Sequence, residues 1–267
     1  MKSYIVDSFT SEAFKGNPAA VCLLDNSIDS GVMLKIAQEF NLSETAFIKK
    51  TTISNTYSIQ YFSPKIEIPL CGHATLASAK VLFETTDIKE INFITTNNVH
   101  LFVKKDNDEI LMEFPLYGTV AATAPDLMLK ALGLKHIVDV AFNEELKIFI
   151  IEINDDNVLA ALDPSYDELL RSYNNINGVV VSALSKNSKF DFHYRYFWPW
   201  SGTNEDPVTG GVQTFLAKYW SDKLGKYKMK AFQSSKRSGY MDVEIVSDKV
   251  IIKSKAVIIL EGNLAGF

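Results

Sequence analysis

The sequence predicts an α+β fold that is built mainly from β-strands and divided into two similar lobes. Strand-like apolar runs separated by turn residues occur along most of the chain, and few segments carry helical spacing, so a regular alternation of strand and helix is excluded. The chain also contains a short internal repeat. A Pro-x-x-Gly turn that leads into an amphipathic helix begins at Pro69 and again at Pro207, which is an offset of 207 − 69 = 138 residues. This repeat favours an internal duplication.

The predicted strands combine apolar side chains with flanking turn residues. In chain order they cover residues 4–9, 19–24, 56–62, 91–95, 147–153, 178–184, 190–197 and 249–253. In the run 56–62, polar and apolar residues are mixed on both faces, which is typical of a sheet that uses both of its faces.

Four helices are predicted from apolar residues at i, i+3, i+4 and i+7 or from an alanine-rich run. The first follows the possible caps Asp29 and Ser30, the second covers about 73–83, and the third has Asp163 as its N-cap and Pro164 at its first position. The periodic positions of the first, third and fourth helices are Met33, Ile36, Ala37 and Phe40; Tyr166, Leu169, Leu170 and Tyr173; and Val212, Phe215, Leu216 and Tyr219.

Length and composition indicate a globular protein of one or two domains. The chain has 267 residues, of which 47% are hydrophobic and 22% are charged. We place a boundary near residues 115–125, which gives an N-terminal lobe of 1–117, completed by about 255–267, and a C-terminal lobe of 118–254.

Charge and cysteine content exclude several classes of function. The net charge of −5 and the pI of about 5.5 disfavour binding to nucleic acid or to an anionic membrane. Two cysteines are too few for a disulfide framework, and the first residues lack the apolar segment of a signal peptide. We therefore expect a cytoplasmic protein that does not span a membrane.

Two glycine turns are candidate anion sites. Gly72 and the pair Gly210 and Gly211 each lie where a turn becomes a helix, and the amides at a helix start bind anions. If the two lobes are similar, both helix starts point into one cleft. The alternative is that each glycine merely permits a tight turn before its helix.

Four polar residues are candidates for the remainder of a site. Glu44 enters an apolar strand, where burial would raise its pKa into the range of proton transfer, although it could equally close the preceding helix. His73 is a candidate hydrogen-bonding residue or a structural histidine. Asp206 could orient a histidine or cap the last helix, and Asn17 could line the site or form a turn.

Metal and thiol chemistry are disfavoured by spacing. No HxH, HxxxH or CxxC pattern accompanies His73, so we expect no metal at Cys71 or Cys22 and no disulfide between them. The residue that echoes Cys71 at the 138-residue offset is Thr209, which argues against a two-thiol epimerase. His193 lies in a strand-like run and is expected to be structural.

Taken together, these motifs resemble the PhzF family of phenazine-biosynthesis-like proteins. The resemblance rests on five segments in order: residues 6–10 (VDSFT), 16–21 (GNPAAV), 42–47 (LSETAF), 69–75 (PLCGHAT) and 202–210 (GTNEDPVTG). It implies the fold of diaminopimelate epimerase, in which each lobe is a curled, mostly antiparallel sheet around a central helix. It also implies a site between the lobes, no cofactor or metal, and a homodimer.

The same resemblance implies an isomerase. The family's founding activity is the isomerisation of trans-2,3-dihydro-3-hydroxyanthranilate, and Glu44 would be the acid/base, with His73 and Asp206 completing the polar site. We therefore expect a proton shift on a small carboxylated substrate, cyclic or unsaturated.

One departure from the family keeps two other functions open. Members commonly follow the second glycine turn with Ser-Ala-His, whereas this chain has Gly211, Val212 and Gln213, and so lacks a hydroxyl near the expected anion. A non-catalytic small-molecule binder or interaction protein that retains the cleft is the first alternative. A thiol-dependent racemase or epimerase is the second.

Overall fold

The computed structural model describes residues 1–266, which form two compact units. Unit 1 comprises 1–113 and 252–267, and unit 2 comprises 114–251. The C-terminal segment thus returns to the first unit. Among residues 1–266, no helix is both long and apolar enough to cross a membrane.

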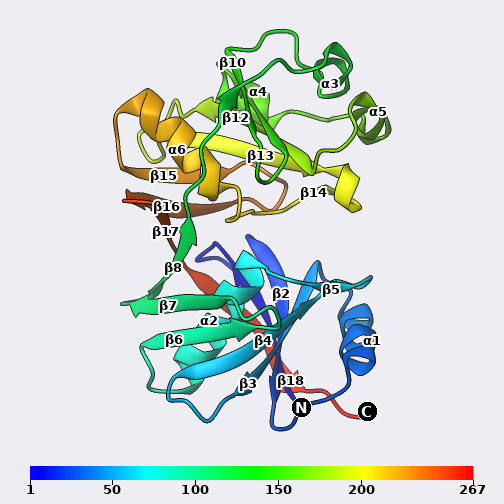
Figure 1. Cartoon of the computed structure of the whole chain (residues 1–267), viewed down its shortest axis with the longest axis vertical. Coiled ribbons are helices and arrows are strands. Elements are labelled where there is room, and N and C mark those ends of the chain that lie inside the picture. The colour runs from blue at the N-terminus through cyan, green and yellow to red at the C-terminus, as the bar shows by residue number, and fades with distance from the viewer. Residues whose placement is uncertain (267) are drawn as a thin grey trace. The chain divides into compact units, whose positions relative to one another are not determined.

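Unit 1 is a sheet of mostly antiparallel strands with two helices (Figure 1). Antiparallel pairs join β18 to β1, β1 to β2, β3 to β4 and β6 to β7, whereas β2–β3 and β4–β6 are parallel. Its elements are β1 (Lys2–Ser8), β2 (Asn17–Leu24), α1 (Ser30–Phe40), β3 (Glu44–Lys50), β4 (Thr56–Phe62), β5 (Glu67–Ile68), α2 (Gly72–Thr85), β6 (Glu90–Thr95), β7 (His100–Asp106), β8 (Glu109–Pro115) and β18 (Ala256–Asn263).

Unit 2 repeats this order of pairings. β10–β11, β12–β13 and β15–β16 are antiparallel, whereas β11–β12 and β13–β15 are parallel. Its elements are β9 (Val120–Ala121), α3 (Asp126–Ala131), β10 (Asp139–Asn143), β11 (Ile148–Ile153), α4 (Asp156–Ala160), α5 (Tyr166–Ser172), β12 (Gly178–Leu184), β13 (Phe192–Trp198), η1 (Pro199–Ser201), β14 (Thr203–Glu205), α6 (Gln213–Leu224), β15 (Lys228–Gln233) and β16 (Gly239–Val246), with β17 (Lys249–Ser254) crossing the boundary.

The matching topologies confirm the α+β fold and the duplication expected from the sequence echo. In each unit, a helix follows a short strand, β5 or β14, and precedes the second parallel pairing. α2 and α6 are the two helices that follow the echoed Pro-x-x-Gly turns.

The sheet of unit 1 encloses α2. The helix packs against β1, β2, β3 and β18, and residues 73–79 and 81–83 are all buried, so that side chains on every face of the helix lie in the core. A helix that is apolar all round belongs inside a domain, and burial of each large side chain stabilises the fold by about 1.5–3 kcal/mol. The rigid setting of α2 fixes the position of its first residues.

The first helix packs on the sheet and ends just before the site. Asp29 accepts a hydrogen bond from the Gly31 amide, which confirms it as the N-cap, and Met33, Ile36 and Ala37 pack with residues of β2, β3 and β4. The C-cap Asn41 adopts the left-handed conformation, with φ 49° and ψ 33°, and turns the chain toward β3.

Two predicted helix starts are wrong by a few residues. α5 begins at Tyr166 after Ser165, not after Asp163, because the Ser165 amide donates to Ala131 O at 2.9 Å and its carbonyl accepts from Leu169. α6 begins at Gln213, not near Gly210, because the chain first makes a tighter turn in which the Gln213 amide donates to Gly210 O at 3.0 Å.

Candidate active site

Three segments of unit 1 bring Asn17, Glu44 and His73 together. Asn17 is the first residue of β2, Glu44 is the first residue of β3, and His73 is the second residue of α2. Because β2 and β3 are parallel with Ala19 opposite Glu44, the starts of both strands lie at the same edge. Asn17 is fully buried, and Glu44 and His73 are each 7% exposed.

Glu44 and His73 form a buried ion pair. His73 Nε2 lies 3.0 Å from Glu44 Oε2. Burial alone would lower the pKa of His73, but the neighbouring side chains of Cys71 and Glu44 and the hydrogen bonds to them raise the pKa well above its usual value. His73 Nε2 lies within hydrogen-bonding distance of the Glu44 carboxylate and donates to it.

The expectation that burial raises the pKa of Glu44 is wrong in its net direction. Desolvation does push the pKa up, but the charge of His73 and hydrogen bonds from His73, Ser43 and Cys71 outweigh it, so the pKa lies below its usual value. An ionised Glu44 is a carboxylate that can accept a proton without first losing one.

Asn17, Ser43 and Cys71 surround the ring of His73. The Asn17 amide nitrogen lies 3.2 Å from Nδ1, Ser43 Oγ lies 3.3 Å from Nε2, and Cys71 Sγ lies 3.4 Å from Nδ1. Sequence reasoning missed the contribution of Ser43 to this network. The sequence feature that could have indicated Ser43 is its position directly before Glu44, at the end of the turn that follows α1.

The start of α2 is held from β1. Ser8 Oγ donates to the carbonyl of His73 at 2.8 Å, and both residues are buried. Gly72 is the first helical residue and Cys71 is the N-cap. The first amides of a helix have no partner within the helix, so the start of α2 at Gly72 is suited to an anionic group.

Asp206 lies in unit 2, in a buried network of its own. Thr209 Oγ1 donates to the Asp206 carboxylate, Gln233 Nε2 donates to the Asp206 carbonyl at 2.6 Å, and Gln233 Oε1 accepts from the Thr209 amide at 2.7 Å. Asp206 does not cap α6, because the N-cap of this helix is Val212, six residues further along the chain. Its carboxylate is thus oriented by the turn that follows it.

Gly210 and Gly211 form the turn between Asp206 and α6. Gly210 is buried, and a Cβ added to Gly211 would meet no atom within 4 Å. The serine that family members commonly carry here therefore fits this backbone, and its absence leaves space. The shared cleft expected between the starts of α2 and α6 stays a prediction.

Both cysteines are free and buried. Burial raises the pKa of Cys22 to about 11 and also raises the pKa of Cys71, so neither is a ready thiolate base. Thr209, which occupies the position equivalent to Cys71 in the second half of the chain, donates a hydrogen bond to the Asp206 carboxylate. These properties disfavour the thiol-dependent racemase.

Cys71 nevertheless belongs to a cluster that spacing did not reveal. Glu44, Cys71 and His73 offer a carboxylate oxygen, a thiol sulfur and a ring nitrogen that all lie within 4.8 Å of one another. Glu44 comes from a different element, 73 − 44 = 29 residues before His73, so a search for short metal-binding motifs overlooks it.

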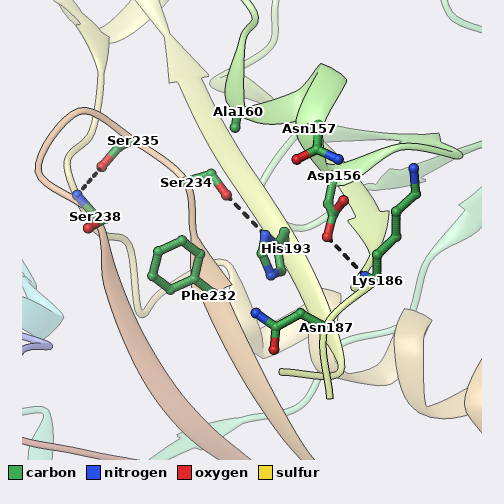
Figure 2. Close-up of a pocket in the computed structure, with 10 residues that line it drawn as sticks. All are labelled: Asp156, Asn157, Ala160, Lys186, Asn187, His193, Phe232, Ser234, Ser235 and Ser238. Carbon is green, nitrogen blue, oxygen red and sulfur yellow. Dashed lines mark hydrogen bonds between the residues drawn. The ribbon is translucent and has the colours of Figure 1, made fainter. Parts of the chain in front are cut away.

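A separate cavity of about 530 Å³ lies in unit 2. Figure 2 shows His193 between Phe232 and Ser234 on one side and Asp156 and Lys186 on the other. The ring nitrogens of His193 lie 3.3 Å from Ser234 Oγ and 3.2 Å from Ser185 Oγ, and burial lowers the pKa of this histidine. His193 is thus neutral and hydrogen-bonded, but it also lines a cavity that the sequence did not suggest.

Comparison with known proteins identifies the family. The family model described as phenazine biosynthesis-like protein (PhzC-PhzF) matches residues 6–262. The chain belongs to this family. A phenazine biosynthesis-like domain-containing protein of Bos taurus is 39% identical over 98% of both chains, and an uncharacterized isomerase of Pseudomonas aeruginosa is 38% identical over 97% of this chain and 96% of its own.

Solved structures share the fold. A PhzF-family protein from Enterococcus faecalis superposes with a TM-score of 0.91 at 34% identity, covering 98% of this chain and 97% of its own. A predicted epimerase from Pseudomonas aeruginosa has a TM-score of 0.73 at 16% identity, over 100% and 99% of the two chains. The epimerase-like fold expected from the motifs is confirmed, and the family includes proteins named as isomerases.

Proposed function

We propose that this protein is a cofactor-independent isomerase that moves a proton between two carbons of a small carboxylated substrate, cyclic or unsaturated. The observation that carries the proposal is the buried pair of Glu44 and His73, with 3.0 Å between Glu44 Oε2 and His73 Nε2. A cytoplasmic homodimer, with the site in the cleft between the lobes, is part of the same proposal.

In this mechanism Glu44 takes the proton from one carbon and returns it at another. The lowered pKa of Glu44 keeps the carboxylate ionised and ready to accept the proton. His73 orients that carboxylate through the Nε2 hydrogen bond, while Asn17 and Ser43 hold the ring. Burial excludes water that would otherwise exchange with the transferred proton.

The substrate carboxylate is assigned to the amides of the glycine turns. Gly72 at the start of α2, and Gly210 and Gly211 before α6, supply backbone N–H groups that carry no side-chain obstruction. Asp206, oriented by Thr209, completes the polar site. The space beside Gly211 favours a substrate that differs from that of members with serine at this position.

Deuterium wash-in tests the proposal. Small unsaturated and cyclic carboxylates, including trans-2,3-dihydro-3-hydroxyanthranilate, are incubated with the protein in D₂O and followed by proton NMR. We expect enzyme-dependent isomerisation of at least one compound, with deuterium entering at the new C–H bond or with the original proton carried across. Compounds that bind but neither isomerise nor exchange would contradict an isomerase.

The cavity in unit 2 favours a second candidate, a small-molecule binder without catalytic activity. Its walls carry hydroxyl, amide and imidazole groups around the ring of Phe232, which is a surface suited to a polar ligand. Substitution of Ser234 separates the two candidates. Ser234→Ala should weaken binding by such a protein but leave proton transfer at Glu44 unchanged.

A further inference from the structure

The turn of residues 206–209, which begins with Asp206, is held by a glutamine from a strand that follows later in the chain. We propose that Gln233 is a positioning residue of the candidate active site and that it fixes the place of Asp206. The proposal rests on the proposed function, because Gln233 would act on the reaction only through Asp206.

Gln233 binds both ends of this turn with a single side chain. Its Nε2 donates to the Asp206 carbonyl at 2.6 Å, and its Oε1 accepts from the Thr209 amide at 2.7 Å. A backbone carbonyl can only accept and a backbone amide can only donate, so these partners fix the orientation of the carboxamide. Gln233 is fully buried, where an unpaired polar group would be costly.

The backbone of Gln233 lies inside the sheet of unit 2. It is the last residue of β15, which pairs with β13 on one side and with β16 on the other, so that Gln233 lies opposite Tyr194 and Gly239. The hydroxyl of Tyr194 donates to the Thr209 carbonyl at 3.0 Å. Thr209 is therefore held at its amide from β15 and at its carbonyl from β13, and the sheet supports the turn.

The backbone of Asp206 is fixed on both sides. Its amide donates to the Tyr196 carbonyl at 3.2 Å, and its carbonyl accepts from Gln233. Its carboxylate accepts from the hydroxyl of Thr209, the same residue whose amide Gln233 holds. Gln233 thus acts on Asp206 in two ways, directly at the carbonyl and through Thr209 at the carboxylate.

The pairing of the Thr209 amide also bears on the substrate anion. Because Gln233 Oε1 accepts from this amide, it is not available to a substrate, and the anion is left to the amides of Gly210 and Gly211. Loss of Gln233 would remove both anchors of the turn at once. A displacement of about 1 Å at a group that must align with the substrate can lower the rate about a hundredfold.

Hydrogen exchange of the Thr209 amide, followed by NMR, tests the contact without a substrate. In Gln233→Met, which keeps the length of the side chain but removes the carboxamide, this amide should exchange at least about tenfold faster. In Gln233→Glu it should stay protected, because a carboxyl oxygen still accepts from it. Unchanged protection in a folded Gln233→Met protein would overturn the proposal.

Turnover distinguishes a positioning residue from one that only stabilises the fold. Gln233→Met should lower kcat at least about tenfold. The same substitution should cost much less in a protein that already carries Asp206→Ala, because its effect passes through Asp206. Equal losses in the two backgrounds would contradict the positioning role. Gln233→Asn, which is one methylene shorter and cannot reach both partners, takes the place of Gln233→Met if that variant does not fold.

Ser182→Ala is the matched control, since Ser182 is also a fully buried polar residue of unit 2, and its hydrogen bonds join His193 and Trp220. Both variants should lower the thermal midpoint, but only Gln233→Met should change exchange at Thr209 and turnover. Faster exchange with unchanged turnover would refute the positioning role and leave the isomerase standing. A protein without isomerase activity would refute the proposed function, and the exchange experiment would still test the contact.

Discussion

At the scale of single residues, the site depends on two side chains whose pKa values shift in opposite directions. The pKa of Glu44 falls below 4.5 and that of His73 rises above 6.5 because each stabilises the charged form of the other. The contribution of Glu44 to stability is present above its unfolded pKa and is lost as the pH falls through the folded value. The contribution of His73 is present below its unfolded pKa and is lost as the pH rises through the folded value.

Both contributions are therefore complete between about pH 4.5 and 6.5. A double-mutant cycle with Glu44→Gln and His73→Gln, followed by urea unfolding, should give a coupling free energy of about 1–3 kcal/mol in this window. The coupling should decrease toward more acidic and more alkaline pH. A coupling that does not vary with pH would show that the two groups do not form an ion pair.

Three of the residues singled out from the sequence lie together in the structure, and their role as a catalytic site stays a prediction. Asn17, Glu44 and His73 do converge, but the pKa of Glu44 moves opposite to the expectation from burial because its partner was not visible in the sequence. The cluster with Cys71 was missed for the same reason. Contacts between residues of different strands and helices depend on the pairing of β2 with β3, which no local motif encodes.

At the scale of elements, the turn before β2 places Asn17. Gly16 has a φ of +66°, and a Cβ added to it would lie 2.0 Å from Ser8 O in the backbone of β1. No side-chain rotation relieves that clash. Strand β1 also carries Ser8, whose hydroxyl donates to the His73 carbonyl at the start of α2. A shift of this turn would therefore displace both Asn17 and the start of α2.

Gly16→Ala should destabilise the protein by well over about 1 kcal/mol, because it adds a clash to the cost of a left-handed alanine. Gly133→Ala is the matched control, since Gly133 has a φ of +72° with no atom within 4 Å of an added Cβ. Urea unfolding measures both. Equal losses of unfolding free energy in the two variants would show that a Cβ at residue 16 does not clash with the Ser8 carbonyl oxygen.

Regular elements were predicted best where one face is apolar. The apolar face of α1 was predicted from its spacing and α2 from its alanine-rich run, whereas β7 and β16 were not predicted. Helix starts shifted where a contact from elsewhere competes, as at Ser165, whose amide bonds to Ala131 O.

At the scale of the whole molecule, the chain returns to unit 1 with its last strand. β18 pairs with β1 along its length and packs on α2, and the amide of Leu264 donates to Met1 O at 2.9 Å. Figure 1 shows the two termini close together at one end of this unit. The enclosure of α2 therefore depends on residues from both ends of the sequence.

Removal of residues 256–267 should unfold unit 1, because β1 would lose a partner and α2 would lose part of its cover. Far-UV circular dichroism and thermal unfolding should show a large loss of ordered strand and a lower midpoint. A chain that ends at Leu264 keeps β18 and serves as the control. Unchanged unfolding of the shorter chain would contradict the role of β18.

The central claim is that Glu44 carries the proton, and turnover of Glu44→Gln tests it most directly. Glutamine keeps the size of the side chain but cannot accept the proton, so turnover on the substrate found by wash-in should fall at least about a hundredfold, with much less change in ligand affinity. His73→Ala and Asp206→Ala should also reduce turnover, with losses that do not add to that of Glu44→Gln. Near-normal turnover by a folded Glu44→Gln protein would contradict the mechanism.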